Sequence, residues 1–181
     1  MTSADLKGLS KQMAWILRHE AERLGMQVDP EGYVSMGELL AALRRTDPQV
    51  NEERVRAVVE QLEQRKQRFG ILGDGIRANY GHSLEMRIEH AQAAPMGALF
   101  HGTTIAAQAN ILLEGLLPMH RQYVHLTPDA ELARVVGSRH GKPGLLRVDA
   151  VRAHADGVAF FKANRNFWLA VHVPARYLSV I

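Results

Sequence analysis

The sequence predicts an α+β protein made of two small lobes. Three observations support this prediction. The chain has 181 residues, its first half shows helical periods followed by a strand–turn–strand pattern, and its second half holds short strand-like runs interrupted by helices. Apolar residues make up 46% and charged residues 23%, which is typical of chains that bury a core. This composition argues against a disordered, collagen-like or coiled-coil protein.

Three helices are predicted in the first half. Apolar residues recur at helical spacing over Leu6–Leu24, and Gly25 is a typical helix C-terminal residue. Ser35 and Glu38 have the spacing of a capping box and predict the start of a second helix. A third helix is expected to begin near Asn51, a favoured N-cap residue.

A β-hairpin is predicted after the third helix. Its strands are Arg68–Leu72 and Ile76–Asn79, and the Gly73-Asp74-Gly75 segment between them is typical of a tight turn. Three helices followed by a two-stranded wing is the winged-helix plan, a variant of the helix-turn-helix. The first half therefore predicts a nucleic-acid-binding lobe.

The boundary between the lobes is predicted within residues 89–97. This stretch has no clear period and contains Pro95 and Gly97. We therefore expect a first lobe over residues 1–88, a linker over 89–97 and a second lobe over 98–181.

The second half predicts a mixed β lobe without a βαβ rhythm. One helix is expected to be capped by Thr104 and to run to Gly115. Another is expected to be capped by Thr127, with Pro128 at its first position. The predicted strands are Ala98–His101, Tyr123–Leu126, Gly144–Val148, Val158–Phe161 and Phe167–Val173.

The charge of the chain gives little evidence for a diffuse nucleic-acid surface. The formal net charge is +3, with −1 in residues 1–90 and +4 in residues 91–181. The 17 arginines outnumber the 5 lysines. Arginine suits bidentate phosphate contacts, but a GC-rich genome would give the same bias. Each arginine must therefore be judged by its own position.

Several classes of protein are excluded or disfavoured by what the sequence lacks. It has no cysteine, no apolar run longer than five residues and no apolar stretch in its first 12 residues, so we expect a cytoplasmic protein without a signal peptide. Walker, Rossmann, GxSxG and HExxH motifs are absent. We expect no metal, and an enzyme built on this sequence would work with His and Arg.

Several polar clusters are hard to explain as ordinary surface. Taken singly, each histidine is more often a satisfied core residue and each arginine a solvated one. The clusters are Arg18-His19, Arg68, the segment from Ile76 to Ser83, His101-Gly102-Thr103, and the pair Arg121 and His125.

Together with their neighbours, these clusters resemble the RNA 2′-phosphotransferase (KptA) family. The resemblance covers roughly Ser10 to Ile181, and two positions depart from the family pattern: Tyr80 replaces the usual Gln, and Thr127 replaces the usual Ser. The segments that carry it, in order, are ILRHEAERLG, GYVSMGELL, KQRF, IRANYGHS, LFHGT, YVHLT, VGSRHGKP, NRNFWL and VHVPARYL.

The resemblance implies a fold and a reaction. The fold would pair an N-terminal winged-helix RNA lobe with a C-terminal NAD-binding lobe similar to ADP-ribosyltransferases. The reaction would remove an internal 2′-phosphate from RNA, as at a tRNA splice junction, and consume NAD. The phosphate would attack the ribose carbon that bears nicotinamide, giving 2′-phospho-ADP-ribosylated RNA and nicotinamide. The neighbouring ribose hydroxyl would then attack phosphorus, releasing 2′-OH RNA and ADP-ribose 1″,2″-cyclic phosphate.

The resemblance also implies roles for particular residues, with a tRNA-like RNA as partner and a monomer as the expected state. The implied catalytic residues are Arg18, His19, Arg68 and Arg121. The implied NAD-binding residues are His101, Gly102, Thr103, His125, Thr127 and Arg139. The residues implied to bridge RNA phosphate and NAD are Arg77, Asn79, Gly81, His82 and Ser83.

Two other functions stay open at this point. The protein could ADP-ribosylate a terminal phosphate of RNA or DNA and stop after the first step. It could instead be a non-catalytic winged-helix binder that senses NAD, although the set Arg18, His19, Arg68 and Arg121 disfavours this. A protein ADP-ribosyltransferase is disfavoured because those enzymes often need a late catalytic Glu, and no Glu follows Glu131.

Overall fold

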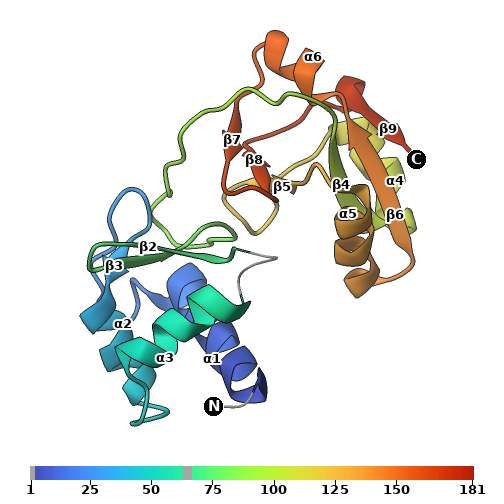
Figure 1. Ribbon diagram of the computed structural model, residues 1–181. Coiled ribbons are helices and arrows are strands. Elements are labelled where there is room, and N and C mark those ends of the chain that lie inside the picture. Colours follow the sequence, from blue (N-terminus) through green and yellow to red (C-terminus); the bar gives the residue numbers. More distant parts are fainter. Residues whose placement is uncertain (1–2, 63–66) are drawn as a thin grey trace. The chain divides into compact units, whose positions relative to one another are not determined.

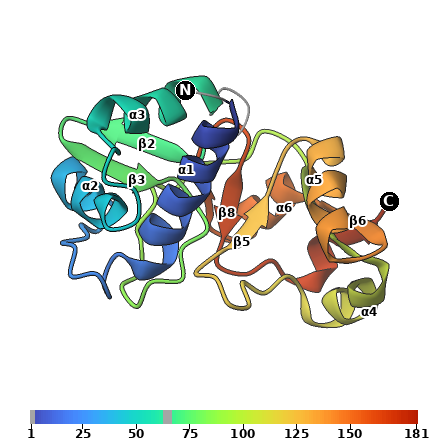
Figure 2. The same ribbon diagram turned by 90° about the horizontal axis from the view of Figure 1, so that it is seen from below.

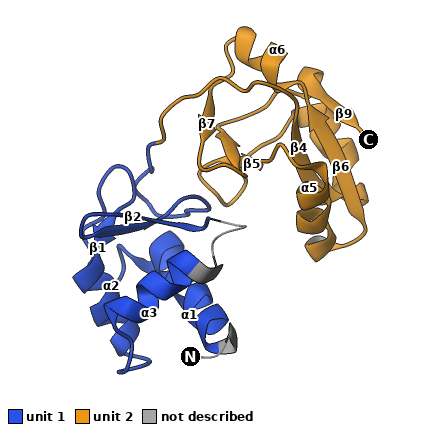
Figure 3. Ribbon diagram, viewed as in Figure 1, with its two compact units in different colours: residues 1–89 blue, residues 90–181 orange. Residues whose placement is uncertain are grey.

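The chain folds into two compact units, Met1–Glu89 and His90–Ile181 (Figure 3). A computed structural model describes residues 3–62 and 67–181. Each unit has its own apolar core and its own antiparallel sheet structure. The predicted α+β class is therefore confirmed. The boundary between the two units follows Glu89. Ala93, within the predicted linker, belongs to the second unit, and its amide donates to the Phe160 carbonyl oxygen there at 2.9 Å.

Three helices build most of the first unit (Figure 1). The elements are α1 (Ser3–Trp15), α2 (Met36–Arg44) and α3 (Glu52–Ala57); a π-helical turn η1 (Ile16–Glu20) continues α1 and a second one, η2 (Val58–Leu62), continues α3. The predicted caps are confirmed: Ser35 and Glu38 form the capping box, and the Asn51 side chain accepts from the Arg54 amide. The helix predicted to reach Leu24 instead ends its regular part at Glu20.

A small sheet completes the first unit. The strands β1 (Val34–Ser35), β2 (Phe69–Leu72) and β3 (Gly75–Ala78) lie in the order β1-β3-β2. Leu72 pairs with Gly75, so Gly73-Asp74 forms a two-residue turn. Gly73 has φ +58°, which glycine adopts without strain. The predicted hairpin is confirmed, and β1 was not predicted.

The core of the first unit fixes the direction of α1. Leu9, Met13, Ile16 and Leu17 are buried against α2, α3 and β3. Burying one such side chain contributes about 1.5–3 kcal/mol, so this face cannot turn outward without a large loss of stability. As a result, Arg18 and His19 follow directly at the edge of the core.

Two antiparallel sheets build the second unit. One has the order β4-β6-β9, from β4 (Leu99–Thr104), β6 (Pro143–Val148) and β9 (Leu178–Val180). The other has the order β5-β8-β7, from β5 (Val124–Leu126), β7 (Phe160–Lys162) and β8 (Trp168–Ala170). Phe100 and Thr127 exchange backbone hydrogen bonds of 2.7 and 3.0 Å and so join the two sheets. All five predicted strands are present with shifted ends, whereas β9 was not predicted.

The helices of the second unit confirm one predicted cap and correct another. Thr104 caps α4 (Ile105–Glu114) as expected. The prediction that Thr127 caps the next helix, with Pro128 at its first position, is wrong. The Thr127 backbone pairs with Phe100, and its hydroxyl accepts from the Asp129 amide at 3.2 Å before the helix begins. The helix α5 (Ala130–Gly137) begins later and is capped by Asp129. A further helix, α6 (Ala150–Ala155), was not predicted, although Asp149 caps it.

The helices α5 and α4 cover opposite faces of the β4–β6 pair (Figures 1 and 2). A Cβ on Gly102 would lie 1.7 Å from the Ala133 carbonyl oxygen of α5, and one on Gly137 would lie 2.5 Å from the Thr103 carbonyl oxygen. On the other face, a Cβ on Gly144 would lie 2.8 Å from the side chain of Gln108 in α4. The backbones of β4 and α5 therefore touch without intervening side chains.

No helix within residues 3–62 and 67–181 is both long enough and apolar enough to cross a lipid bilayer.

Glycine substitutions test the contact between β4 and α5. We expect Gly102→Ala to lower the free energy of unfolding by about 3 kcal/mol or more, because the added Cβ collides with backbone atoms. Gly8→Ala is the matched control: no atom lies within 4 Å of its added Cβ, and it raises the stability of α1 by about 0.5–1 kcal/mol. Thermal unfolding followed by circular dichroism measures both. An unchanged midpoint for Gly102→Ala contradicts the close approach.

Candidate functional site

Most residues predicted to bind RNA phosphate gather in the first unit, around a loop formed by residues 79–83. This 79–83 loop leaves strand β3 and runs beside the π-helical turn η1. A π-helical turn is rare and is frequently found at functional sites. Arg18 and His19 lie on η1, so the loop and the turn bring two separate predicted clusters together.

Arg18 packs on the 79–83 loop through its guanidinium group. Its guanidinium carbon lies 4.9 Å from the centre of the Tyr80 ring, which is within cation–π distance. Gly81 follows with φ +91°, and a Cβ there would lie 3.4 Å from Cδ and Nε of Arg18. Glycine is therefore needed at position 81 for its backbone conformation, and it leaves the space that the Arg18 side chain occupies.

His19 is held by the far end of the same loop. Its Nδ1 atom lies 2.8 Å from Oγ of Ser83, and the Ser83 amide donates to the Arg18 carbonyl oxygen at 3.0 Å. The ring of His19 also lies 4.9 Å from the ring of Trp15. The contact between Nδ1 and Ser83 therefore orients the ring of His19.

Arg68 is tied both to α1 and to the start of the 79–83 loop. Its Nη1 donates to Oγ of Ser10 at 3.3 Å, and its carbonyl oxygen accepts from the Asn79 amide at 2.7 Å. Asn79 is buried and also donates from Nδ2 to the Gln67 carbonyl oxygen. Ser10 is 2% exposed and was not predicted to contact a site residue. A serine among the buried apolar positions of α1 does indicate a side-chain hydrogen bond, here to Arg68.

Two other predicted residues of the first unit have partners elsewhere in it. Arg77 donates from Nη1 to the Glu31 carbonyl oxygen at 2.9 Å, and its guanidinium carbon lies 4.6 Å from the centre of the Tyr33 ring. His82 is buried, and its Nε2 lies near the position that a Cβ on Gly32 would take. These contacts connect Arg77 and His82 with the segment before β1.

The predicted residues of the second unit meet where β4 and β5 approach each other. His101 lies on β4 and His125 on β5. Nδ1 of His101 donates to the His125 carbonyl oxygen at 3.0 Å, and Nη1 of Arg121 donates to Nδ1 of His125 at 3.2 Å. A carbonyl only accepts and a guanidinium only donates. In the neutral rings, His101 therefore carries its proton on Nδ1 and His125 on Nε2.

His101 is held in its neutral form. Burial lowers the pKa of His101 below its ordinary value of about 6.5, because the charged ring loses its hydration. The hydrogen bond to the His125 carbonyl raises the pKa by a smaller amount, and the positive charge of Arg121 lowers it further. The His101 ring is therefore uncharged at neutral pH.

The other residues predicted to bind the dinucleotide have mixed surroundings. Thr127 is buried in the bridge to Phe100, close to this cluster. Gly102 and Thr103 touch the backbone of α5, so packing already requires a glycine at position 102. Arg139 lies on a short 3-10 helix, η3 (Ser138–His140), and its side chain is exposed and takes no part in the contacts of His101 and His125.

The surroundings offer no obvious metal centre. Within the described ranges, no group of three or more His, Asp or Glu side chains is placed to hold a metal ion.

Comparison with known proteins identifies relatives along nearly the whole chain. The family model described as RNA 2′-phosphotransferase, Tpt1/KptA family, matches residues 4–172. A protein named "Probable RNA 2′-phosphotransferase" from Acaryochloris marina is 38% identical, with 95% of each chain covered. Proteins of the same name from Thermococcus kodakarensis and Rhizobium rhizogenes are 43% and 41% identical; the match covers 93% of each chain for the first, and 100% of this chain and 97% of the relative for the second.

The lowered pKa of His101 predicts a pH dependence of stability. Below about pH 6.5 the unfolded chain binds a proton at this histidine that the folded chain resists, so stability is fully present above pH 6.5 and falls as the pH drops below it. We expect thermal midpoints between pH 5 and pH 7.5, a range of about one unit or more on either side of that value, to show a shallower fall for His101→Gln than for the unsubstituted protein. Equal slopes for the two proteins contradict the assignment.

Proposed function

We propose that this chain, which belongs to the RNA 2′-phosphotransferase, Tpt1/KptA family, removes an internal 2′-phosphate from RNA with NAD as the acceptor, as at a tRNA splice junction. The observation that carries the proposal is the 79–83 loop. Asn79 contacts Arg68, Tyr80 contacts Arg18 and Ser83 contacts His19, so one short segment holds three of the four proposed catalytic residues.

The proposed division of work follows the two units. The first unit, with three helices and an antiparallel hairpin, acts as a winged-helix lobe that binds RNA. The second unit acts as an ADP-ribosyltransferase-like lobe that binds NAD. The acceptor ribose of NAD supplies the carbon to which the phosphate is transferred, and nicotinamide is the leaving group.

Arg18 and Arg68 are proposed to hold the 2′-phosphate. A guanidinium group presents paired N–H donors that match the oxygens of a phosphate, and each hydrogen bond to a charged group contributes about 1.5–3 kcal/mol. Both side chains are already oriented, Arg18 by Tyr80 and Arg68 by Ser10. Such orientation matters in the first step, because the phosphate is anionic and needs alignment more than it needs a base.

His19 and Arg121 are proposed to act mainly in the second step. There a ribose hydroxyl loses its proton as it attacks phosphorus, and the departing RNA 2′-oxygen gains one. Histidine titrates in the range needed for these transfers, and the contact with Ser83 orients the His19 ring for them. Arg121 is proposed to stabilise the negative charge that grows on the phosphate oxygens.

The residues of the second unit fit a dinucleotide with a positively charged nicotinamide ring. His101, whose pKa is lowered mainly by burial, is neutral and adds no second positive charge to that of Arg121 in this cluster. His125 and Thr127 are proposed to complete this binding region, with Gly102 and Thr103 contributing backbone groups and Arg139 lying near the adenosine or pyrophosphate. The argument for His101 depends on charge and not on a particular pose of the ligand.

The proposal is tested by incubating the purified protein with NAD and a short RNA that carries one internal 2′-phosphate. Separation of the RNA and small-molecule products should show 2′-OH RNA, nicotinamide and ADP-ribose 1″,2″-cyclic phosphate. A persistent ADP-ribosylated RNA without the cyclic product indicates a first step only, and repeating the assay with 5′-phosphorylated RNA and DNA then tests terminal-phosphate transfer. NAD binding without nicotinamide release indicates a non-catalytic binder and overturns the proposal.

The roles given to His19 and Ser83 predict different magnitudes of the same effect. We expect His19→Ala to slow the second step about 100-fold or more, so that 2′-phospho-ADP-ribosylated RNA accumulates. Ser83→Ala removes only the hydrogen bond that orients the ring, and we expect a slowing of about 3- to 10-fold with the same intermediate. Single-turnover time courses of the intermediate measure both.

The matched control is Ser138→Ala, because the Ser138 hydroxyl donates to the Val135 carbonyl oxygen on α5 and has no contact with His19 among the described hydrogen bonds. It should leave both steps unchanged. If His19→Ala instead abolishes nicotinamide release and no intermediate forms, the assignment of His19 to the second step is wrong.

A further inference from the structure

The exposed face of α1 carries a row of side chains that leads to His19. Lys7, Lys11 and Trp15 are spaced four residues apart, so they lie along one ridge of the helix, about 6 Å apart along its axis. All three are exposed. His19 continues the row beyond the start of η1, as the 4.9 Å distance between the Trp15 and His19 rings shows.

Trp15 is the unusual member of this row. It is 59% exposed, whereas the other tryptophan, Trp168, is 9% exposed and belongs to the core of the second unit. An indole ring left in water forgoes the large stabilisation that its burial would give. Packing of the first unit's core therefore does not account for a tryptophan at position 15. Its ring faces solvent beside His19, where a ligand can contact it.

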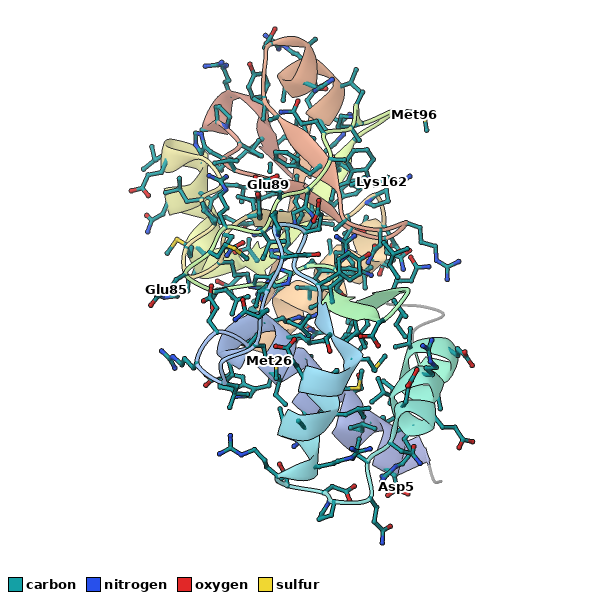
Figure 4. All side chains as sticks on the ribbon, turned by 90° about the vertical axis from the view of Figure 1, so that its left-hand side faces the viewer. Asp5, Met26, Glu85, Glu89, Met96 and Lys162 are labelled. Carbon is teal, nitrogen blue, oxygen red and sulfur yellow. The ribbon has the colours of Figure 1, made fainter. Side chains whose placement is uncertain are left out.

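The charges around the row favour an anionic ligand. Lys7 and Lys11 face solvent along the ridge, and a Cβ on Gly8 between them would meet no atom within 4 Å, so the surface there is open. Within α1 and η1, the acidic residues are Asp5 and Glu20, one toward each end. Asp5 lies at the start of α1 (Figure 4), and Glu20 is paired with Arg23 at 3.3 Å.

We propose that Lys7, Lys11 and Trp15 form a track for single-stranded RNA, in which the base next to the 2′-phosphorylated nucleotide stacks on Trp15 and the adjoining phosphates contact the two lysines. Lysines that follow a backbone, combined with an aromatic ring that accepts any base, are the features with which proteins bind single strands. The inference rests on the proposed function for the identity of the ligand as RNA.

The test uses a single-stranded oligoribonucleotide that carries one internal 2′-phosphate and measures binding in the absence of NAD. RNA should quench tryptophan fluorescence in the unsubstituted protein. In Trp15→Phe, where only the buried Trp168 remains, the quenching should disappear while the affinity falls less than about threefold. Trp15→Leu keeps apolar bulk without a stacking ring and should weaken binding about tenfold.

Two further comparisons separate stacking from charge. An abasic residue next to the 2′-phosphorylated nucleotide should make the unsubstituted protein and Trp15→Leu bind equally, because the base that stacks is gone. The double variant Lys7→Gln/Lys11→Gln should flatten the slope of log affinity against log salt by about 1.4, at roughly 0.7 for each phosphate contact. Arg45→Gln, which removes one positive charge from the exposed end of α2, is the control and should leave the slope unchanged.

The outcomes distinguish this inference from the proposed function. RNA binding with Trp15 quenching but without release of the 2′-phosphate overturns the proposed function and leaves the track standing. Release of the phosphate with Trp15→Leu binding as tightly as the unsubstituted protein overturns the track alone. Quenching that persists in Trp15→Phe, equal affinity for double-stranded RNA, or no RNA binding at all also overturns the track.

Discussion

The contact between the 79–83 loop and the π-helical turn η1 is the constraint on which the arrangement of the first unit depends. The apolar face of α1 is buried up to Leu17, so the next residues must leave the core at a fixed place. There the Arg18 carbonyl accepts from the Ser83 amide, and the missing side chain of Gly81 leaves space for the Arg18 guanidinium. Core packing therefore sets where the arginine emerges, and the loop sets how it is oriented.

In the second unit, backbone contacts position the strand that carries His101. Gly102 and Gly137 let β4 and α5 touch, which leaves little freedom for the segment that carries His101. The bridge between Phe100 and Thr127 then fixes β4 against the sheet of His125. A histidine held in this way has its tautomer and its protonation state set by the fold, through the His125 carbonyl and through burial.

Features that depend on local sequence could be predicted, and features that depend on distant contacts could not. The hairpin turn, the Ser35–Glu38 capping box and the Asn51 and Thr104 caps are encoded within a few residues, and the structure contains them. The helix start at Ala130 was missed because the Thr127 backbone pairs with Phe100, which lies far away in the sequence, so Thr127 and Pro128 precede the helix. The π-helical turn and the contact between Ser10 and Arg68 likewise depend on packing that no periodicity reports.

Electrostatics explain why the two clusters are built from different residues. A phosphate group requires fixed positive charge, and arginine keeps its charge at any physiological pH, so Arg18 and Arg68 suit the proposed role of holding it. The second cluster combines one fixed charge, on Arg121, with the ring of His101, whose neutral form burial favours. The nearby Arg121 adds to this effect, since each positive charge close to His101 makes its protonation less favourable.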